Sequence, residues 1–158
     1  MRERLTARVL LFDPRGRILL MKGRLASDPD RPGEWFTIGG GVKGGETLEE
    51  AAAREIREES GVRDFVLGPV VARRDIAFVG AGGAPVLSRE HYLVARCQGG
   101  DPSREGWNAA ERALVDEIRW WTPESLAAMS EPVHPAGLAG RLADLVAGRY
   151  PAVPESWA

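Results

Sequence analysis

Three glutamates near the middle of the chain, Glu55, Glu58 and Glu59, are the residues best suited to chemistry. They lie in an acidic segment whose apolar residues recur with the period of a helix. At about 100° per residue, Glu55 and Glu59 fall about 20° either side of Leu48 and so within the apolar stripe, and Glu58 falls about 80° from Leu48. Carboxylates buried there are costly unless a cation meets them. Their oxygens suit a divalent metal ion.

The segment carries its own start and stop signals. Thr47 followed three residues later by Glu50 fits a capping box, and Gly61 is a natural C-terminal stop. We therefore expect a helix between Thr47 and Gly61. A run rich in glycine precedes it at residues 39–45, where the backbone can turn sharply and approach a metal ion or phosphates closely. The sequence thus predicts a glycine loop that feeds an acidic helix.

This arrangement resembles the signature of the Nudix hydrolases. The matching residues are Gly40, Glu46, Arg54, Glu55, Ile56, Glu58, Glu59, Gly61 and Val62. A chance match over residues 40–62 is expected in fewer than about one in a million chains. One departure is Ile38, where many members have a proline that would only stiffen the loop entry. The resemblance implies an α/β fold, an α/β/α sandwich with a mixed β-sheet, in a single domain over residues 1–158.

The resemblance also implies a metal site. Its ligands would be the carboxylates of Glu55, Glu58 and Glu59 and the backbone carbonyl of Gly39, and the metal would be Mg²⁺ or Mn²⁺. Arg54 joins the catalytic set because its guanidinium can grip carboxylates in a bidentate fashion. Either Glu58 or Glu59 would be the general base, and the sequence does not decide between them.

Three glutamates on one helix approach a metal from one side only, and in this family an acidic residue further along the chain often completes the site. The candidates are Asp101, Glu105, Glu111, Asp116 and Glu117. We choose Glu111, because the flexible stretch before it could swing it over a substrate. Glu117, at the start of an expected strand, is the alternative.

The family takes nucleoside diphosphates linked to another moiety. We therefore expect metal-dependent hydrolysis of a phosphoanhydride bond in such a nucleotide, or in a nucleoside triphosphate. Trp107 and Trp35 could stack on the nucleobase, and Arg24 could meet the phosphates. The alternatives are an isomerase of the isopentenyl-diphosphate type and a non-catalytic sensor of a nucleotide or ADP-ribose. The intact signature weighs against both.

Composition excludes several classes of partner. The chain has 158 residues and a net charge of −2, which argues against broad binding to nucleic acid polymers or anionic membranes. We find no apolar stretch long enough for a membrane span or a signal peptide. A single cysteine, Cys97, excludes an intramolecular disulfide and suits the cytoplasm. We expect a cytoplasmic enzyme that acts on a small nucleotide and leave a homodimer open.

The periodicity of apolar and polar residues, together with turn residues, predicts the remaining loops, helices and strands. Expected loops cover residues 22–34 and 98–112, and expected helices cover 124–129 and 138–147. Expected strands cover residues 6–12, 17–21, 35–37, 65–73, 75–79, 86–96 and 117–122.

Overall fold

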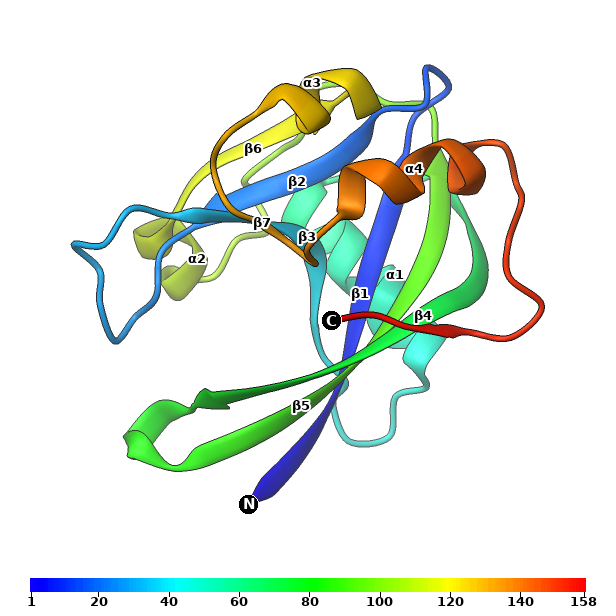
Figure 1. Cartoon of the computed structure of the whole chain (residues 1–158). Coiled ribbons are helices and arrows are strands. Elements are labelled where there is room, and N and C mark those ends of the chain that lie inside the picture. The colour runs from blue at the N-terminus through cyan, green and yellow to red at the C-terminus, as the bar shows by residue number, and fades with distance from the viewer.

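One mixed β-sheet organises the chain in the computed structural model, which describes residues 1–158 apart from the side chain of Ala81 (Figure 1). Its strands are β1 (Arg2–Phe12), β2 (Ile18–Gly23), β3 (Glu34–Gly41), β4 (Phe65–Val79), β5 (Pro85–Cys97), β6 (Val115–Trp121), β7 (Val133–His134) and β8 (Glu155–Ser156). Neighbours follow the order β6-β2-β3-β1-β5-β4-β8, and β7 pairs with β3. The pairs β1–β5, β3–β7 and β4–β8 are parallel, so the sheet is mixed.

Helices cover both faces of this sheet. They are α1 (Leu48–Ser60), α2 (Ala109–Leu114), α3 (Pro123–Ala128) and α4 (Leu138–Val146), with a 3₁₀ turn at Ala81–Gly83. Helix α1 packs on one face, and α3 and α4 pack on the other (Figure 1). The expected α/β/α sandwich is therefore confirmed. None of the described helices has the length and apolarity to cross a membrane.

Strand β1 supplies both cores because its side chains alternate between the two faces. Val9 and Leu11 pack in the cluster beneath α1, whereas Leu10 and Phe12 pack in the cluster with α3 and α4. All four side chains are fully buried. The central place of β1 therefore fixes α1 against one side of the sheet.

Towards the N-terminus of β1, the α3–α4 face changes from apolar to polar. The alternate positions are now Arg4, Thr6 and Arg8 instead of leucine and phenylalanine. Here β4 and β5 continue beside β1 as a long arm that extends past the core (Figure 1). Since charged side chains cannot extend an apolar core, this part of the face is left to form a cleft.

The boundaries expected for the acidic helix are confirmed. Thr47 and Glu50 form the capping box in both directions, and Gly61 ends the helix in the left-handed conformation at φ 76°. Cys97 is a free thiol that is buried in the apolar cluster beneath α1.

Several other expectations were incomplete. Gly39, Gly40 and Gly41 were assigned to a loop but pair with β1 as the end of β3. A Cβ on Gly39 would lie 2.1 Å from the carbonyl oxygen of Ala7, so this pairing requires glycine. Residues 65–79 form one strand with bulges instead of two strands, and the supposed loop 98–112 runs into α2. The two-residue strands β7 and β8 carry no sequence signal.

Candidate active site

Helix α1 turns Glu55 and Glu59 towards the glycines at the end of β3. Their residues are only 8% and 4% exposed. The backbone N–H of Gly39 donates to Oε1 of Glu59 over 2.7 Å. A Cβ on Gly40 would lie 2.4 Å from Oε1 of Glu55, so the missing side chain makes room for this carboxylate. These are the two carboxylates that the helical count placed closest to the apolar stripe.

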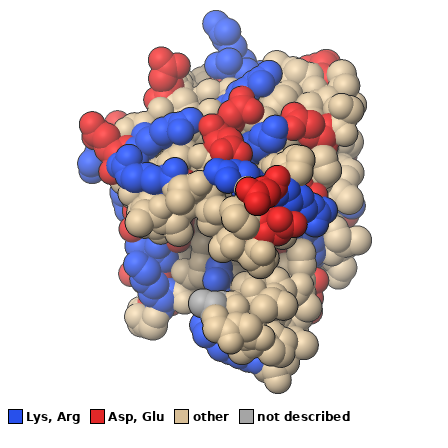
Figure 2. Space-filling view, turned by 90° about the vertical axis from the view of Figure 1, so that its left-hand side faces the viewer, with Lys and Arg blue, Asp and Glu red and all other residues tan. Residues whose placement is uncertain are grey.

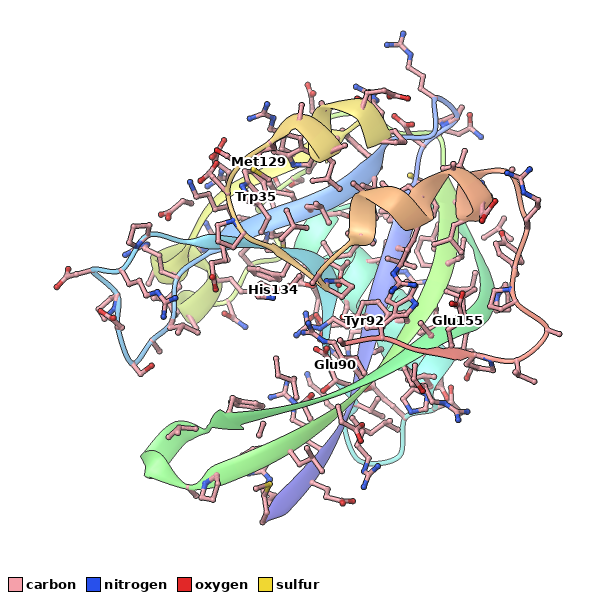
Figure 3. All side chains as sticks on the ribbon, in the orientation of Figure 1. Trp35, Glu90, Tyr92, Met129, His134 and Glu155 are labelled. Atoms are coloured by element: carbon pink, nitrogen blue, oxygen red, sulfur yellow. The ribbon has the colours of Figure 1, made fainter. Side chains whose placement is uncertain are left out.

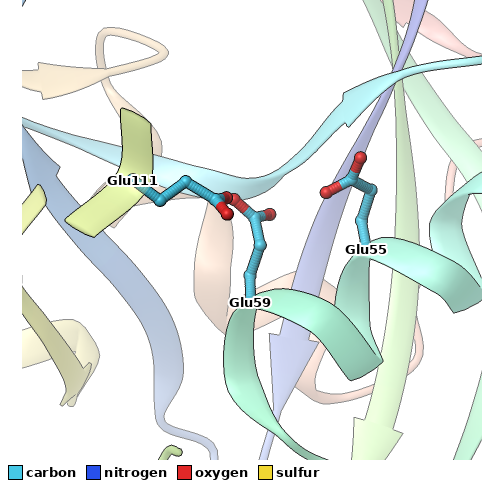
Figure 4. A group of neighbouring side chains, drawn as sticks. All are labelled: Glu55, Glu59 and Glu111. Atoms are coloured by element: carbon cyan, nitrogen blue, oxygen red, sulfur yellow. The ribbon is translucent and has the colours of Figure 1, made fainter. Parts of the chain in front are cut away.

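Glu111 joins these two glutamates, and Glu58 does not. One carboxylate oxygen from each of Glu55, Glu59 and Glu111 lies within 4.8 Å of the others (Figure 4). We call these three residues the carboxylate triad. The side chain of Glu58 is 44% exposed and lies 3.4 Å from Nη1 of Arg54. A role for Glu58 as a metal ligand, and for the carbonyl of Gly39, stays a prediction.

The segment before α2 is fixed to the end of α1, and this places Glu111. The indole N–H of Trp107 donates to the backbone oxygen of Glu59 over 2.7 Å, and the N–H of Ser103 donates to that of Ser60 over 2.8 Å. These bonds satisfy carbonyls that the end of a helix leaves free. Glu111 then forms a capping box with Asn108 at the start of α2. It is therefore held by a helix, and the swinging loop that we expected is not what positions it.

Neither tryptophan expected to stack on a nucleobase is available. Trp107 is 5% exposed and the guanidinium of Arg104 lies 4.7 Å from its ring centroid. Trp35 is 1% exposed and packs edge-on against Trp121, with 4.9 Å between centroids. Both rings belong to packed interiors, because their apolar area is used by the fold. The expectation of stacking on Trp107 or Trp35 was wrong for this structure.

The alternative fourth carboxylate, Glu117, lies on β6 with a side chain that is 46% exposed and 3.9 Å from Arg119. It is not part of the triad. Arg24, expected to meet phosphates, does line a cleft, although its Nε donates to Asp116 over 3.1 Å.

Arg54 connects the loop before α1 to the triad. Its Nε and Nη2 donate to the two oxygens of Glu46 over 2.7 and 2.9 Å, and its Nη1 donates to Glu55 over 2.8 Å. Nη2 also donates to the carbonyl of Gly41 over 3.0 Å. Hydrogen bonds from Arg54, and then from the N–H of Lys43, lower the pKa of Glu46 to about 2. Arg54 thus orients Glu55 while Glu46 stays ionised.

Burial shapes the electrostatics of the triad. It raises the pKa of Glu59 well above its usual value, and a hydrogen bond with Glu111 and the charge of Glu55 raise it further. Burial also raises the pKa of Glu55, although Arg54 opposes this. The triad by itself therefore favours a shared proton. Three carboxylate oxygens with so little compensating charge fit a hard divalent cation, which prefers oxygen ligands.

A cavity of about 440 Å³ lies between the β4–β5 arm and the segment that joins β2 to β3, and the triad residues are not among those that line it. Basic side chains gather around the hollow on this side of the molecule (Figure 2). The arginines that line it are Arg4, Arg8, Arg24, Arg31 and Arg74. We call this cavity the arginine cleft. Gly41 links it to the triad, since its carbonyl binds Arg54 and a Cβ on it would lie 2.9 Å from Nε of Arg4.

Sequence reasoning missed the cleft residues Arg8, Arg74 and Glu90. The signal that could have revealed them is the alternation of side chains between the two faces of a strand. Glu90 is two residues before the buried Tyr92 on β5, so it had to share the inward face of that strand. Arg8 likewise precedes Leu10 on the inward face of β1. A charged residue in such a row indicates either a buried ion pair or a binding surface.

The family model for the NUDIX domain matches residues 2–140 of this chain. The chain belongs to the Nudix family. The α1 segment and its glycines are thus the Nudix signature in a member of that family. Glu55 and Glu59 of the triad lie on it, whereas Glu111 lies on α2.

Curated relatives match shorter stretches of this Nudix chain. Nucleoside triphosphatase NudI from Enterobacter sp. (strain 638) is 48% identical over 98 residues, which cover 60% of this chain and 66% of that protein. NudI from Escherichia coli O139:H28 (strain E24377A / ETEC) is 63% identical over 30 residues, 19% of this chain and 21% of that protein. The chain therefore spans less than two thirds of the length of these relatives.

Solved structures match almost the whole chain. The NUDIX domain of Shewanella oneidensis NrtR complexed with ADP ribose gives a TM-score of 0.65 at 18% identity, over 92% of this chain and 90% of that one. The solution structure of the E. coli ORF135 protein gives a TM-score of 0.60 at 24% identity, over 97% of this chain and 96% of that one. At these identities the likeness shows a shared Nudix fold.

The raised pKa of Glu59 predicts how stability depends on pH without metal. A raised carboxyl pKa adds stability below the unfolded value of 4.5, and this contribution is lost as pH rises towards the folded value. In EDTA, Glu59→Gln should therefore gain stability over the unchanged protein between pH 5 and 8, by at most about 1.4 kcal/mol per pH unit. Urea unfolding at each pH measures the difference. Parallel stability curves would contradict the assignment.

The close approach of the Glu55 carboxylate to Gly40 predicts that a side chain at position 40 would disturb metal binding. Gly40→Ala places a methyl group against the carboxylate of Glu55 and should weaken Mn²⁺ binding about 10- to 100-fold. This is the loss of affinity that is typical when the surroundings that orient a metal ligand are changed. Calorimetric titration with Mn²⁺ measures this. Gly44→Ala is the matched control, because a Cβ there meets no atom within 4 Å. Equal affinities in the two variants would show that Glu55 does not hold the cation.

Proposed function

We propose that this Nudix protein hydrolyses a phosphoanhydride bond in a nucleoside diphosphate linked to another moiety, or in a nucleoside triphosphate, with Mg²⁺ or Mn²⁺. The observation that carries the proposal is the carboxylate triad, with Glu55 and Glu59 buried, together with a cleft lined by arginines that Gly41 connects to it. The triad supplies oxygen ligands, and the arginines complement phosphate charge. Similarity to the nucleoside triphosphatase NudI supports this class of substrate.

Each residue of the site has a distinct task in this proposal. A divalent cation bound to Glu55, Glu59 and Glu111 would offset the charge of the phosphates and activate a water as the nucleophile. Arg54 orients Glu55 by a hydrogen bond and opposes the rise in the pKa of Glu55 that burial causes. Glu58 lies outside the triad with a partly exposed carboxylate, so it can accept the proton of the attacking water without releasing a ligand. Glu59 is the other candidate for this base.

The arginine cleft suits the rest of the substrate. Its volume lies within the range of about 300–1,000 Å³ that small-molecule sites occupy. Phe36 and Phe78 also line it, and they replace the tryptophans as aromatic surfaces for a nucleobase. We further propose that residues 1–158 act as one domain, in the cytoplasm and as a monomer or homodimer, on small nucleotides.

A panel of nucleotides tests the activity. Nucleoside triphosphates and nucleoside diphosphate derivatives are incubated with Mg²⁺, with Mn²⁺ or with EDTA, and phosphate-bearing products are separated by chromatography. We expect hydrolysis of at least one class with metal and none in EDTA. Tight binding of one member without hydrolysis of any would replace the enzyme by a nucleotide sensor. Conversion of an isoprenoid diphosphate without release of phosphate would favour the isomerase.

Charge removal on α1 and α2 tests the assigned carboxylates. Glu58→Gln, Glu59→Gln and Glu111→Gln keep the side-chain size, and each should lower kcat at least about 10²-fold because a charged group at the reacting centre is lost. The control is Glu49→Gln, which is exposed on the first turn of the same helix and should change kcat less than twofold. Full activity in Glu111→Gln would remove that residue from the site.

A further inference from the structure

Glu90 is a buried carboxylate in the wall of the arginine cleft, and the proposed hydrolysis does not use it. The residue is 2% exposed and lies beside Tyr92 at the base of the β4–β5 arm (Figure 3). Its Oε2 accepts from Nε of Arg8 over 2.9 Å. Its Oε1 accepts from Nε of Arg74 over 2.7 Å and from the hydroxyl of Tyr92 over 3.2 Å. Both oxygens are thus occupied by the protein, which leaves Glu90 little capacity to bind a ligand.

Both arginines bind Glu90 through Nε, so their terminal nitrogens are left for other partners. Nη1 of Arg8 donates to the carbonyl of Thr37 over 3.3 Å. Within the described residues, Nη2 of Arg8 and both terminal nitrogens of Arg74 have no hydrogen-bond acceptor. The side chains of Arg8 and Arg74 are only 20% and 10% exposed, and both line the cleft. These N–H groups are not among the buried atoms without a partner, so they are open to the cleft, where acceptor oxygens of a ligand can reach them.

The charges on this wall do not balance. Arg4 lies beside Arg8, and its Nε donates to the hydroxyl of Thr6 over 3.3 Å, which is a neutral partner. Burial, and then the charge of Arg8, lower the pKa of Arg4. On this wall three guanidinium groups stand against one lining carboxylate, Glu90, although the charge of Glu55 also acts on Arg4. Glu34, the other carboxylate in the cleft, pairs instead with Arg31 and His134.

We infer that Glu90 is a positioning residue that fixes Arg8 and Arg74 as a paired receptor for a phosphate group, independent of any cation at the carboxylate triad. Two guanidinium groups anchored by Nε present their terminal N–H groups in a set orientation, and this geometry suits phosphate oxygens. The inference rests on the proposed function only in taking the ligand to be a nucleotide. It assigns the binding of one phosphate to the sheet, away from the Nudix helix.

Inorganic pyrophosphate in EDTA is the probe, because it carries phosphate oxygens but no base and leaves the triad without metal. Calorimetric titration of the unchanged protein should show binding, and Arg8→Gln and Arg74→Gln should each weaken it about tenfold or more. Arg89→Gln is the matched control. Arg89 lies one residue before Glu90 on β5 but pairs with Glu3 and Asp75 outside the cleft, so its loss should leave the affinity unchanged. No binding in EDTA would overturn the inference.

Glu90→Gln distinguishes a role of Glu90 in orienting the arginines from a purely electrostatic effect of its charge. Removing a negative charge near the site would tighten pyrophosphate binding if Glu90 acted only through its field. If it orients Arg8 and Arg74, binding should weaken about tenfold, and the change should add little to an Arg8→Gln/Arg74→Gln double variant. Unchanged or tighter binding in a folded Glu90→Gln protein would overturn the inference.

A second variant covers failure of Glu90→Gln to fold. Arg8→Lys keeps the charge, but a single ammonium group cannot bind Glu90 and a phosphate with the fixed fork of arginine. It should bind pyrophosphate about tenfold more weakly, and unchanged affinity would contradict the positioning role. These outcomes are separate from the nucleotide panel. Hydrolysis without pyrophosphate binding in EDTA rejects only the receptor, and binding without hydrolysis rejects only the enzyme.

Discussion

The burial of Glu55 and Glu59 between α1 and the end of β3 is the constraint on which the rest of this structure depends. Carboxylates in such a place cost free energy unless donors or cations compensate them. The N–H of Gly39 and the guanidinium of Arg54 compensate only in part. Such incomplete compensation suits this group of carboxylates to a cation. Two apolar clusters on the faces of one sheet hold α1 in place, and their burial offsets this cost in free energy.

Glycine makes that burial geometrically possible. At Gly39 and Gly40 the chain keeps the pairing of β3 with β1 while leaving no side chain where Ala7 and Glu55 already lie. Arg54 then donates to the carbonyl of Gly41 and to both oxygens of Glu46, and these bonds join strand, loop and helix. The residues of the Nudix signature therefore make this packing possible, in addition to supplying carboxylates.

The sheet carries a second polar system on its opposite face. There the alternation that builds the core along β1 and β5 continues with Arg8 and Glu90 in place of apolar residues. Burial and pairing of these charges keep the arginines ordered, and the free N–H groups face the cleft. A substrate that reached both systems would meet the carboxylate oxygens of the triad at one end and guanidinium groups at the other.

The sequence by itself determined the local features. The spacing of the signature, the capping box at Thr47 and the helical period that turns Glu55 and Glu59 inwards all depend on neighbours within one or two turns. Only the tertiary structure decided that Glu111 lies beside Glu59, that Trp107 is an anchor and that Arg8 and Arg74 share Glu90. These contacts join residues far apart in the chain, such as the bond from Trp107 to Glu59 across 48 positions. No local period encodes such pairs, because they follow from how the sheet orders its strands and where a loop packs on a helix end.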